Sequence, residues 1–156
     1  FTTTYVPTGD FPFDFDNIAN ATAALQTAVD GGADAVYPYL GGAHRPVVQA
    51  ANEAGIITMS AGSSTVCTDE ELAYDIAVKF DGGDYVRAVM EEIVTGEFTE
   101  GTVKQFKVGV DPEPGALICD ATAEEQAAMD DIYTRVAGGE FAADLGAIAG
   151  EAFAAG

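Results

Sequence analysis

Strand-like stretches alternate with helical stretches along the first part of the chain, and this alternation limits the fold more than any other feature. Thr2 to Val6, Ala33 to Tyr39 and Ile56 to Met59 carry β-branched or aromatic residues, which favour strands. Between them, apolar residues recur at helical spacing from Asn17 and again from Pro46, and glycines end both runs. Two strand–helix–strand units in a row predict an α/β fold, with a parallel sheet flanked by helices.

The second half of the chain predicts further helices and short strands. An apolar stripe from Tyr85 to Val94 predicts a helix, and the capping box of Thr122 and Glu125 predicts the start of another. Lys104 to Val110 and Ala116 to Cys119 predict two strands. Leu72 to Phe80 is a mixed stretch that ends in the apolar run Ile76-Ala77-Val78, and this run also favours a strand.

Two segments predict little regular structure. Asp10 to Asp16 is rich in turn-forming residues and lacks helical spacing, so we expect a loop whose last residue, Asp16, caps the following helix. The Ala- and Gly-rich tail after Phe141 predicts a frayed or partly helical end.

A large acidic excess limits the partners. The 156 residues include 26 Asp and Glu against 6 Lys and Arg, a formal net charge of −20. Nucleic acids and anionic membranes require a basic face, so both are excluded as partners. Because 48% of the residues are hydrophobic, the chain has enough apolar surface to fold as a globular body. No apolar run has the roughly 20 residues that a membrane span needs.

The two cysteines, Cys67 and Cys119, lack the spacing and the histidine partners of a zinc site. They form one disulfide if the protein is exported, whereas two buried free thiols are the alternative in an intracellular protein. No other metal or cofactor motif occurs in the sequence, so we expect no cofactor.

An enzyme remains an alternative that depends on a single histidine. A nucleophilic site would pair His44 with Ser63 or Cys67, or with Ser60 or Ser64 nearby. None of these serines lies in a G-x-S-x-G elbow, and we therefore expect a binding protein rather than an enzyme. A structural or interaction domain without a ligand is the third alternative.

Four features mark a possible ligand site beyond the carboxyl ends of the strands. Gly41 and Gly42 lie between a strand and a helix, where close backbone approach and free N–H groups suit an oxygen-rich ligand, or where only a tight turn is needed. His44 beside them is either a pocket donor or an exposed loop residue. Lys79 follows an apolar run in a chain with few cations, and either lines a cleft or pairs with a carboxylate. Phe15 and its neighbouring loop aromatics present rings to a planar ligand or cap the core.

An ordered set of short motifs resembles a known family, the BMP (basic membrane lipoprotein, PnrA-like) substrate-binding proteins of ABC transporters. The resemblance runs from Tyr5 to about Val110, and the helix after Thr122 is similar to the family's final helix. The motifs that carry it are Tyr5-Val6, Phe15-Asp16, Gly32 to Tyr37, Leu40 to Ala43, Ala50 to Ile56 and Val78-Lys79.

This resemblance implies a type 1 periplasmic-binding-protein fold, in which two α/β lobes joined by a hinge close on a small ligand, often a purine nucleoside. It places Phe15 where the family stacks an aromatic on the base, Gly41 and Gly42 in the Gly-Gly loop, and Lys79 at the end of the lysine-bearing strand. The position of the family's ribose-binding aspartate is occupied here by Gly62, followed by Ser63. A hydroxyl group of the ligand would therefore lose its charged acceptor. The partners implied are a nucleoside- or sugar-like ligand and an ABC permease.

The resemblance also sets the expected domains and location. Residues 1–70 correspond to the second, C-terminal-type ligand-binding lobe, and residues 71–156 to a hinge crossing, a helix that packs on the first lobe, and C-terminal segments. By this correspondence, most of the first lobe is missing. The resemblance also implies an extracellular or periplasmic protein that is anchored as a lipoprotein in its full-length form. The chain opens at Phe1 without a leader, which fits a removed signal segment or a piece of a longer protein.

The apolar stripe from Tyr85 to Val94 generates a prediction about association. Without the first lobe this stripe faces water, so we expect the isolated chain to bind the missing half or a second copy of itself. Multi-angle light scattering should detect a species heavier than the monomer, and a strictly monomeric sample at all concentrations would contradict the expectation.

Overall fold

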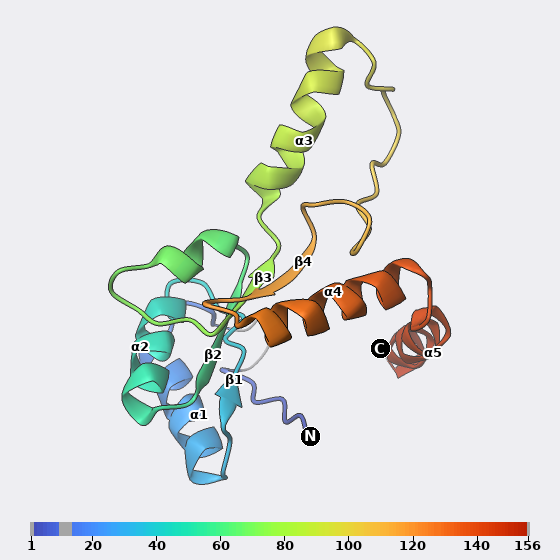
Figure 1. Cartoon of the computed structure of the whole chain (residues 1–156). Helices are drawn as coiled ribbons and strands as arrows, with labels where there is room; N and C mark the ends of the chain where they lie inside the picture. The colour runs from blue at the N-terminus through green and yellow to red at the C-terminus, as the bar shows by residue number, and fades with distance from the viewer. Residues whose placement is uncertain (1, 10–13, 156) are drawn as a thin grey trace. The chain divides into compact units, whose positions relative to one another are not determined.

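The computed structural model describes residues 2–9 and 14–155, which form two compact units (Figure 1). Unit 1 comprises residues 1–79 and 116–120, and unit 2 comprises residues 80–115 and 121–156. The chain therefore passes between the units at three points in the sequence. The predicted loop residues 10–13 lie outside the described part of the chain.

Unit 1 contains a four-stranded open sheet in the order β1-β2-β3-β4, so the chain belongs to the α/β class. The strands are β1 (Ala35–Val36), β2 (Ile57–Ala61), β3 (Ile76–Lys79) and β4 (Gly115–Ile118). β1 pairs in parallel with β2, and β2 pairs in parallel with β3.

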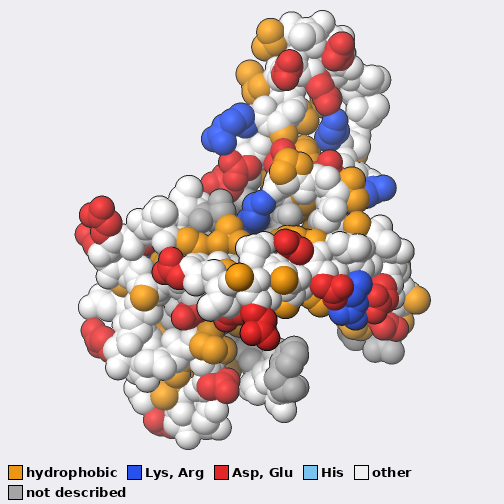
Figure 2. Space-filling view, in the orientation of Figure 1, with side chains coloured by type: hydrophobic (Ala, Val, Ile, Leu, Met, Phe, Trp, Pro, Cys, Tyr) orange, Lys and Arg blue, Asp and Glu red, His pale blue; other side chains and the backbone are white. Residues whose placement is uncertain are grey.

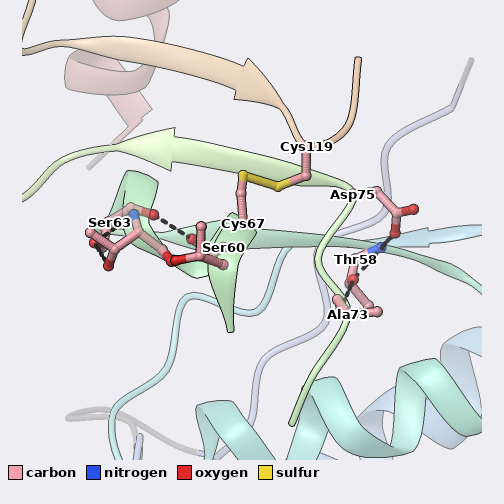
Figure 3. Close-up of a disulfide and its surroundings, with 9 residues drawn as sticks. Thr58, Ser60, Ser63, Cys67, Ala73, Asp75 and Cys119 are labelled. Carbon is pink, nitrogen blue, oxygen red and sulfur yellow. Dashed lines mark hydrogen bonds between the residues drawn. A yellow bond between two sulfur atoms is a disulfide. The ribbon is translucent and has the colours of Figure 1, made fainter. Parts of the chain in front are cut away.

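β4 departs from the expected parallel arrangement. Cys119, directly after β4, donates its backbone N–H to the carbonyl of Asp75, directly before β3, at 2.8 Å. The end of β4 therefore lies beside the start of β3, and the two arrows point in opposite directions (Figure 3). The sheet is mixed, with β1 to β3 forming its parallel part.

Two of the predicted strands are absent, and a third is short. The segment Thr2 to Val6 forms no strand, because no neighbouring strand offers it a ladder of hydrogen bonds. Lys104 to Val110 forms no strand either; its last residues form turns in which Asp111 accepts the backbone N–H of Lys107. The predicted strand Ala33 to Tyr39 is reduced to the two residues of β1.

The helices begin and end close to where their local signals place them. α1 (Ile18–Asp30) is capped by Asn17, not by Asp16, because the Asn17 side chain accepts the backbone N–H of Asn20. α2 (His44–Ala54) ends at Gly55, whose positive φ of 70° suits glycine.

The core of unit 1 lies where α1 and α2 pack together against the first two strands. Ala21 and Leu25 of α1 meet residues of α2 in one buried cluster, and Val36 and Ile56 pack on it from the strand side. The α2 members are small, which lets the two helices approach closely. The buried residues at and within α2 are Ala43, Val47, Val48 and Ala51.

A disulfide joins two distant segments of unit 1 (Figure 3). Cys67 lies in the short 3₁₀ helix η1 (Ser64–Thr68) between β2 and β3, and Cys119 follows β4. The bridge spans 52 residues of sequence and ties the β2–β3 connection to the end of β4. Of the two alternatives for the cysteines, the structure has the bridged form.

Unit 2 is formed by three helices, α3 (Gly82–Thr95), α4 (Ala123–Ala137) and α5 (Ala142–Ala155), so the tail after Phe141 is helical. The capping box of Thr122 and Glu125 opens α4 as predicted. Gly109 lies so close to α4 that a Cβ atom would be 2.4 Å from the carbonyl oxygen of Tyr133, which explains the glycine there.

The predicted apolar stripe on α3 remains at the surface. Figure 2 shows hydrophobic side chains among acidic ones over this helix, and no residue of α3 is fully buried. Its most exposed apolar members are Val86, Met90, Ile93 and Val94. Among the described residues, no helix is long and apolar enough to span a membrane.

The disulfide gives a prediction for stability. Replacing both cysteines, Cys67→Ser with Cys119→Ser, should lower the free energy of unfolding by about 4 kcal/mol, because the chain-entropy model assigns that value to a loop of this length. Urea denaturation of the wild type and the double variant measures the difference. A thiol reductant should weaken the wild type and leave the variant unchanged. Equal stability of all samples would contradict the prediction.

Candidate functional site

The carboxyl ends of β1, β2 and β3 bring most of the predicted site residues to one edge of the sheet. Gly41 and Gly42 follow β1, Gly62 and Ser63 follow β2, and Lys79 is the last residue of β3. The pairing of Ala61 with Val78 places the last two of these groups side by side. Ligands of open α/β sheets bind beyond this edge, and we take it as the candidate site.

Phe15 joins this edge through its backbone. Its carbonyl oxygen accepts the N–H groups of Gly41, at 3.1 Å, and of Ala43, at 3.3 Å. Its side chain is 41% exposed and meets the ring of Tyr39 edge to face, with centroids 6.5 Å apart. The ring is therefore accessible beside the Gly41-Gly42 turn.

The two glycines are explained by Asp16 rather than by a ligand. The Asp16 carboxylate accepts the backbone N–H of Gly42, and a Cβ at Gly41 would lie 2.5 Å from the same oxygen. The N–H groups of Gly41, Gly42 and Ala43 all have partners within the chain. These three N–H groups are therefore engaged within the chain, and the glycine pair allows the close approach of Asp16.

His44 holds the local structure together and is neither a pocket donor nor an exposed loop residue. It is the first residue of α2, half-buried, with Nδ1 2.8 Å from the carbonyl oxygen of Pro38. Since a carbonyl only accepts, Nδ1 donates to it, and Nε2 shares a hydrogen bond of 3.3 Å with the Tyr74 hydroxyl. The rings of His44 and Tyr74 lie nearly parallel, with centroids 6.0 Å apart.

Ser60 within β2 and Ser63 after it are joined by a hydrogen bond, and Ser63 also bonds to a neighbour (Figure 3). Ser60 is fully buried and donates to the carbonyl of Ser63 at 3.3 Å. The Ser63 hydroxyl shares a 2.7 Å hydrogen bond with that of Thr65 and caps η1. Gly62 has a φ of +109° and donates its N–H to the carbonyl of Val78, so a side chain there would be strained.

The structure pairs His44 with neither Cys67 nor Ser63. The Cys67 sulfur is bonded to Cys119, so in this oxidised form it offers no thiolate nucleophile. Both ring nitrogens of His44 are engaged with Pro38 and Tyr74, and neither contacts Ser63.

Lys79 is half-buried at the end of β3. Its position beside Gly62 and Ser63 at the carboxyl edge matches the placement that the sequence predicts. Among the described residues, no group of three or more His, Cys, Asp and Glu side chains is placed to hold a metal ion.

Sequence reasoning missed the polar side chains that fix the connection between η1 and β3. Arg45 of α2 binds Asp69 at 2.6 Å and Glu71 at 2.7 Å. At the other end of the helix, Asn52 exchanges two hydrogen bonds with the backbone of Ala73. Each partner lies more than 20 residues away, so no local pattern could have indicated these contacts.

A second pair of residues fixes the start of β3 against β2. Asp75 accepts the backbone N–H of Thr58 at 2.8 Å, and the buried Thr58 hydroxyl donates to the carbonyl of Ala73 at 2.9 Å (Figure 3). Burial of Thr58 is thereby compensated by hydrogen bonds, as a buried hydroxyl requires.

The surroundings of the site shift the pKa values of Asp69, Tyr74 and Tyr37. The Arg45 guanidinium, and then the N–H groups of Glu71 and Leu72, lower the pKa of Asp69 to about 2. Burial raises the pKa of the Tyr74 phenol. Burial, followed by the nearby Tyr39, raises the pKa of Tyr37, so both phenols stay neutral at physiological pH.

Comparisons of the sequence with protein-family models and curated proteins, and of the structure with solved structures, find no match for this chain.

The Arg45–Asp69 pair predicts how stability depends on pH. The folded-state pKa of Asp69 is about 2, below its ordinary 3.8, so its contribution is present above about pH 4 and is lost as the pH falls to 2. Arg45→Gln should destabilise the protein above pH 4, with the difference from wild type vanishing near pH 2. Urea denaturation at a series of pH values measures this.

Arg87→Gln is the matched control, because Arg87 forms only an exposed pair with Asp84 three residues away on α3. It should leave stability nearly unchanged at every pH. A pH-independent loss in Arg45→Gln would mean that Arg45 acts by packing rather than through the Asp69 carboxylate.

Proposed function

We propose that this chain is the C-terminal part of the substrate-binding protein of an ABC importer, and that it binds a small polar, nucleoside-like ligand at the carboxyl edge of β1 to β3. The observation that carries the proposal is the placement of Phe15, Ser63 and Lys79 at that edge. An aromatic ring, a hydroxyl and an ammonium group there offer a face for a planar base and polar partners for its oxygen and nitrogen atoms.

The fold supports a type 1 periplasmic-binding-protein lobe. Three consecutive parallel strands, with two helices packed on them, have the organisation that the BMP family resemblance implies for the second lobe. The chain also passes between two compact units at more than one point, as a hinged protein does. Under this proposal, unit 1 supplies the ligand-binding surface, and the exposed stripe of α3 packs on a first lobe or a second copy.

The ligand differs in one respect from the family's purine nucleosides. Gly62 stands where the family has its ribose-binding aspartate, and the Gly62 N–H is taken by Val78. The Ser63 hydroxyl is already paired with Thr65, so it accepts or donates to a ligand only by sharing that bond. A ligand with fewer hydroxyl groups than ribose fits this edge better than one that depends on a carboxylate.

The disulfide supports a location outside the cytoplasm. Disulfides persist in oxidising compartments such as the periplasm and the cell exterior. Cys67 and Cys119 are bridged in the structure, in agreement with an exported, lipoprotein-anchored binding protein that delivers its ligand to an ABC permease.

A thermal-shift screen of nucleosides, sugars and amino acids tests the proposal. One class, nucleosides first, should raise the melting temperature, and Lys79→Ala should abolish that rise, measured against the unliganded melting temperature of the same variant. Lys107→Ala, an exposed lysine of unit 2, is the matched control and should keep the full ligand effect.

Two outcomes would overturn the proposal. An equal fall in melting temperature with and without ligand would make Lys79 part of a structural ion pair. No stabilisation by any class would favour a structural or interaction domain without a ligand.

A further inference from the structure

Three aromatic side chains of unit 1 form an exposed cluster after β1. The rings of Tyr37 and Tyr39 lie nearly parallel, 28° apart, with centroids separated by 6.4 Å. Phe15 meets Tyr39 edge to face at 6.5 Å. The exposed fractions are 46% for Tyr37, 61% for Tyr39 and 41% for Phe15, so much of each ring faces water. The exposed faces of Tyr37 and Tyr39 are therefore candidate binding surface.

The backbone between the two tyrosines is held rigidly. Tyr39 donates its N–H to the carbonyl of Tyr37 at 3.2 Å, and Leu40 donates to that of Pro38 at 3.0 Å, which are two successive tight turns. Pro38 is buried, and its carbonyl also accepts Nδ1 of His44. The rings therefore begin from a fixed backbone, and a ligand that contacts them pays little ordering entropy.

The hydroxyl groups of both tyrosines lack partners among the described residues. Among the described residues, the side-chain contacts of the two tyrosines are the ring contact of Tyr37 with Tyr39 and that of Tyr39 with Phe15. The carboxylate that follows Phe15, that of Asp16, is engaged with Gly42. Neutral phenols with open ring faces offer a negative electrostatic face and two polar groups, without a charge of their own.

We propose that Tyr37 and Tyr39, with Phe15 behind Tyr39, bind an organic cation through their ring faces. Ring faces attract cations through the aromatic quadrupole, and the formal net charge of −20 adds a long-range attraction for positive ligands and a repulsion for anions. An uncharged aromatic ligand would gain only contact area. An anionic ligand would be repelled both by the ring faces and by the net negative charge. This site shares Phe15 with the proposed site for a nucleoside-like ligand, but it does not use Lys79.

Titration of the protein with choline tests the proposal. Its uncharged isostere, in which a tert-butyl group replaces the trimethylammonium group, is the matched ligand control. Choline should bind with a Kd about fivefold to tenfold lower than the isostere, as expected for a cation on partly exposed rings. NMR titration measures both constants, and the aromatic signals of Tyr37 and Tyr39 should shift.

Variants separate contact with the rings from general attraction to an acidic protein. Tyr39→Leu keeps the net charge and should abolish the preference for choline, whereas Tyr39→Phe should keep it. Tyr5→Leu removes another tyrosine, 79% exposed, that has no ring contact with any described residue, and should have no effect. High salt screens the long-range attraction but leaves the preference for choline over the isostere.

Equal binding of choline and its isostere would overturn the cation assignment in favour of a neutral ring. A preference for choline that survives in Tyr39→Leu, or the absence of any binding, would overturn the site itself. The effect of Lys79→Ala on nucleoside stabilisation is measured separately, so failure of the cation site is distinguishable from failure of the proposed function.

Discussion

Close packing of α2 against α1 and the sheet is the contact on which the rest of unit 1 depends. Ala43, Val47, Val48 and Ala51 are each 2% exposed or less, and their small side chains let the helix axis lie near its neighbours. Unit 1 has few other fully buried apolar residues, so little else can compensate if this contact loosens. The start of α2 is thereby fixed beside the carboxyl end of β1, where the candidate site lies.

Helix ends were predictable from the sequence because their signals are local, whereas strand pairing was not, although β2, β3 and β4 lie where strands were predicted. A cap and a closing glycine lie within one helix length, and α1, α2 and α3 end where Gly31, Gly55 and Gly96 stop them. A strand needs a partner from elsewhere in the chain. Thr2 to Val6 has strand composition and no partner, while β4 pairs with β3 across a helical insertion that no local pattern indicates.

The sequence indicated where the site lies better than what its residues do. The carboxyl ends of the strands were predictable from their alternation with helices, and Lys79 lies at such an end. Gly42 and His44 contact Asp16 and Tyr74, which are 26 and 30 residues away, so short-range spacing could not indicate these contacts. The ion pair of Arg45 with Asp69 also joins residues that are far apart in the sequence. It ties α2 to the segment leading into β3, and so positions Lys79 indirectly.

Charge limits the ligands of unit 1 at two different distances. Its sequence contains two basic residues, Arg45 and Lys79, and Arg45 is paired with Asp69 and Glu71. At longer range, the net charge of −20 repels anions and attracts cations. Salt at 0.1 M limits the reach of this electrostatic field to about 10 Å. At contact, therefore, individual side chains decide. Lys79 favours an electron-rich oxygen or nitrogen, whereas the faces of Tyr37 and Tyr39 favour a positive group. A multiply charged anion such as a nucleotide is disfavoured at both distances, because a single lysine cannot neutralise it.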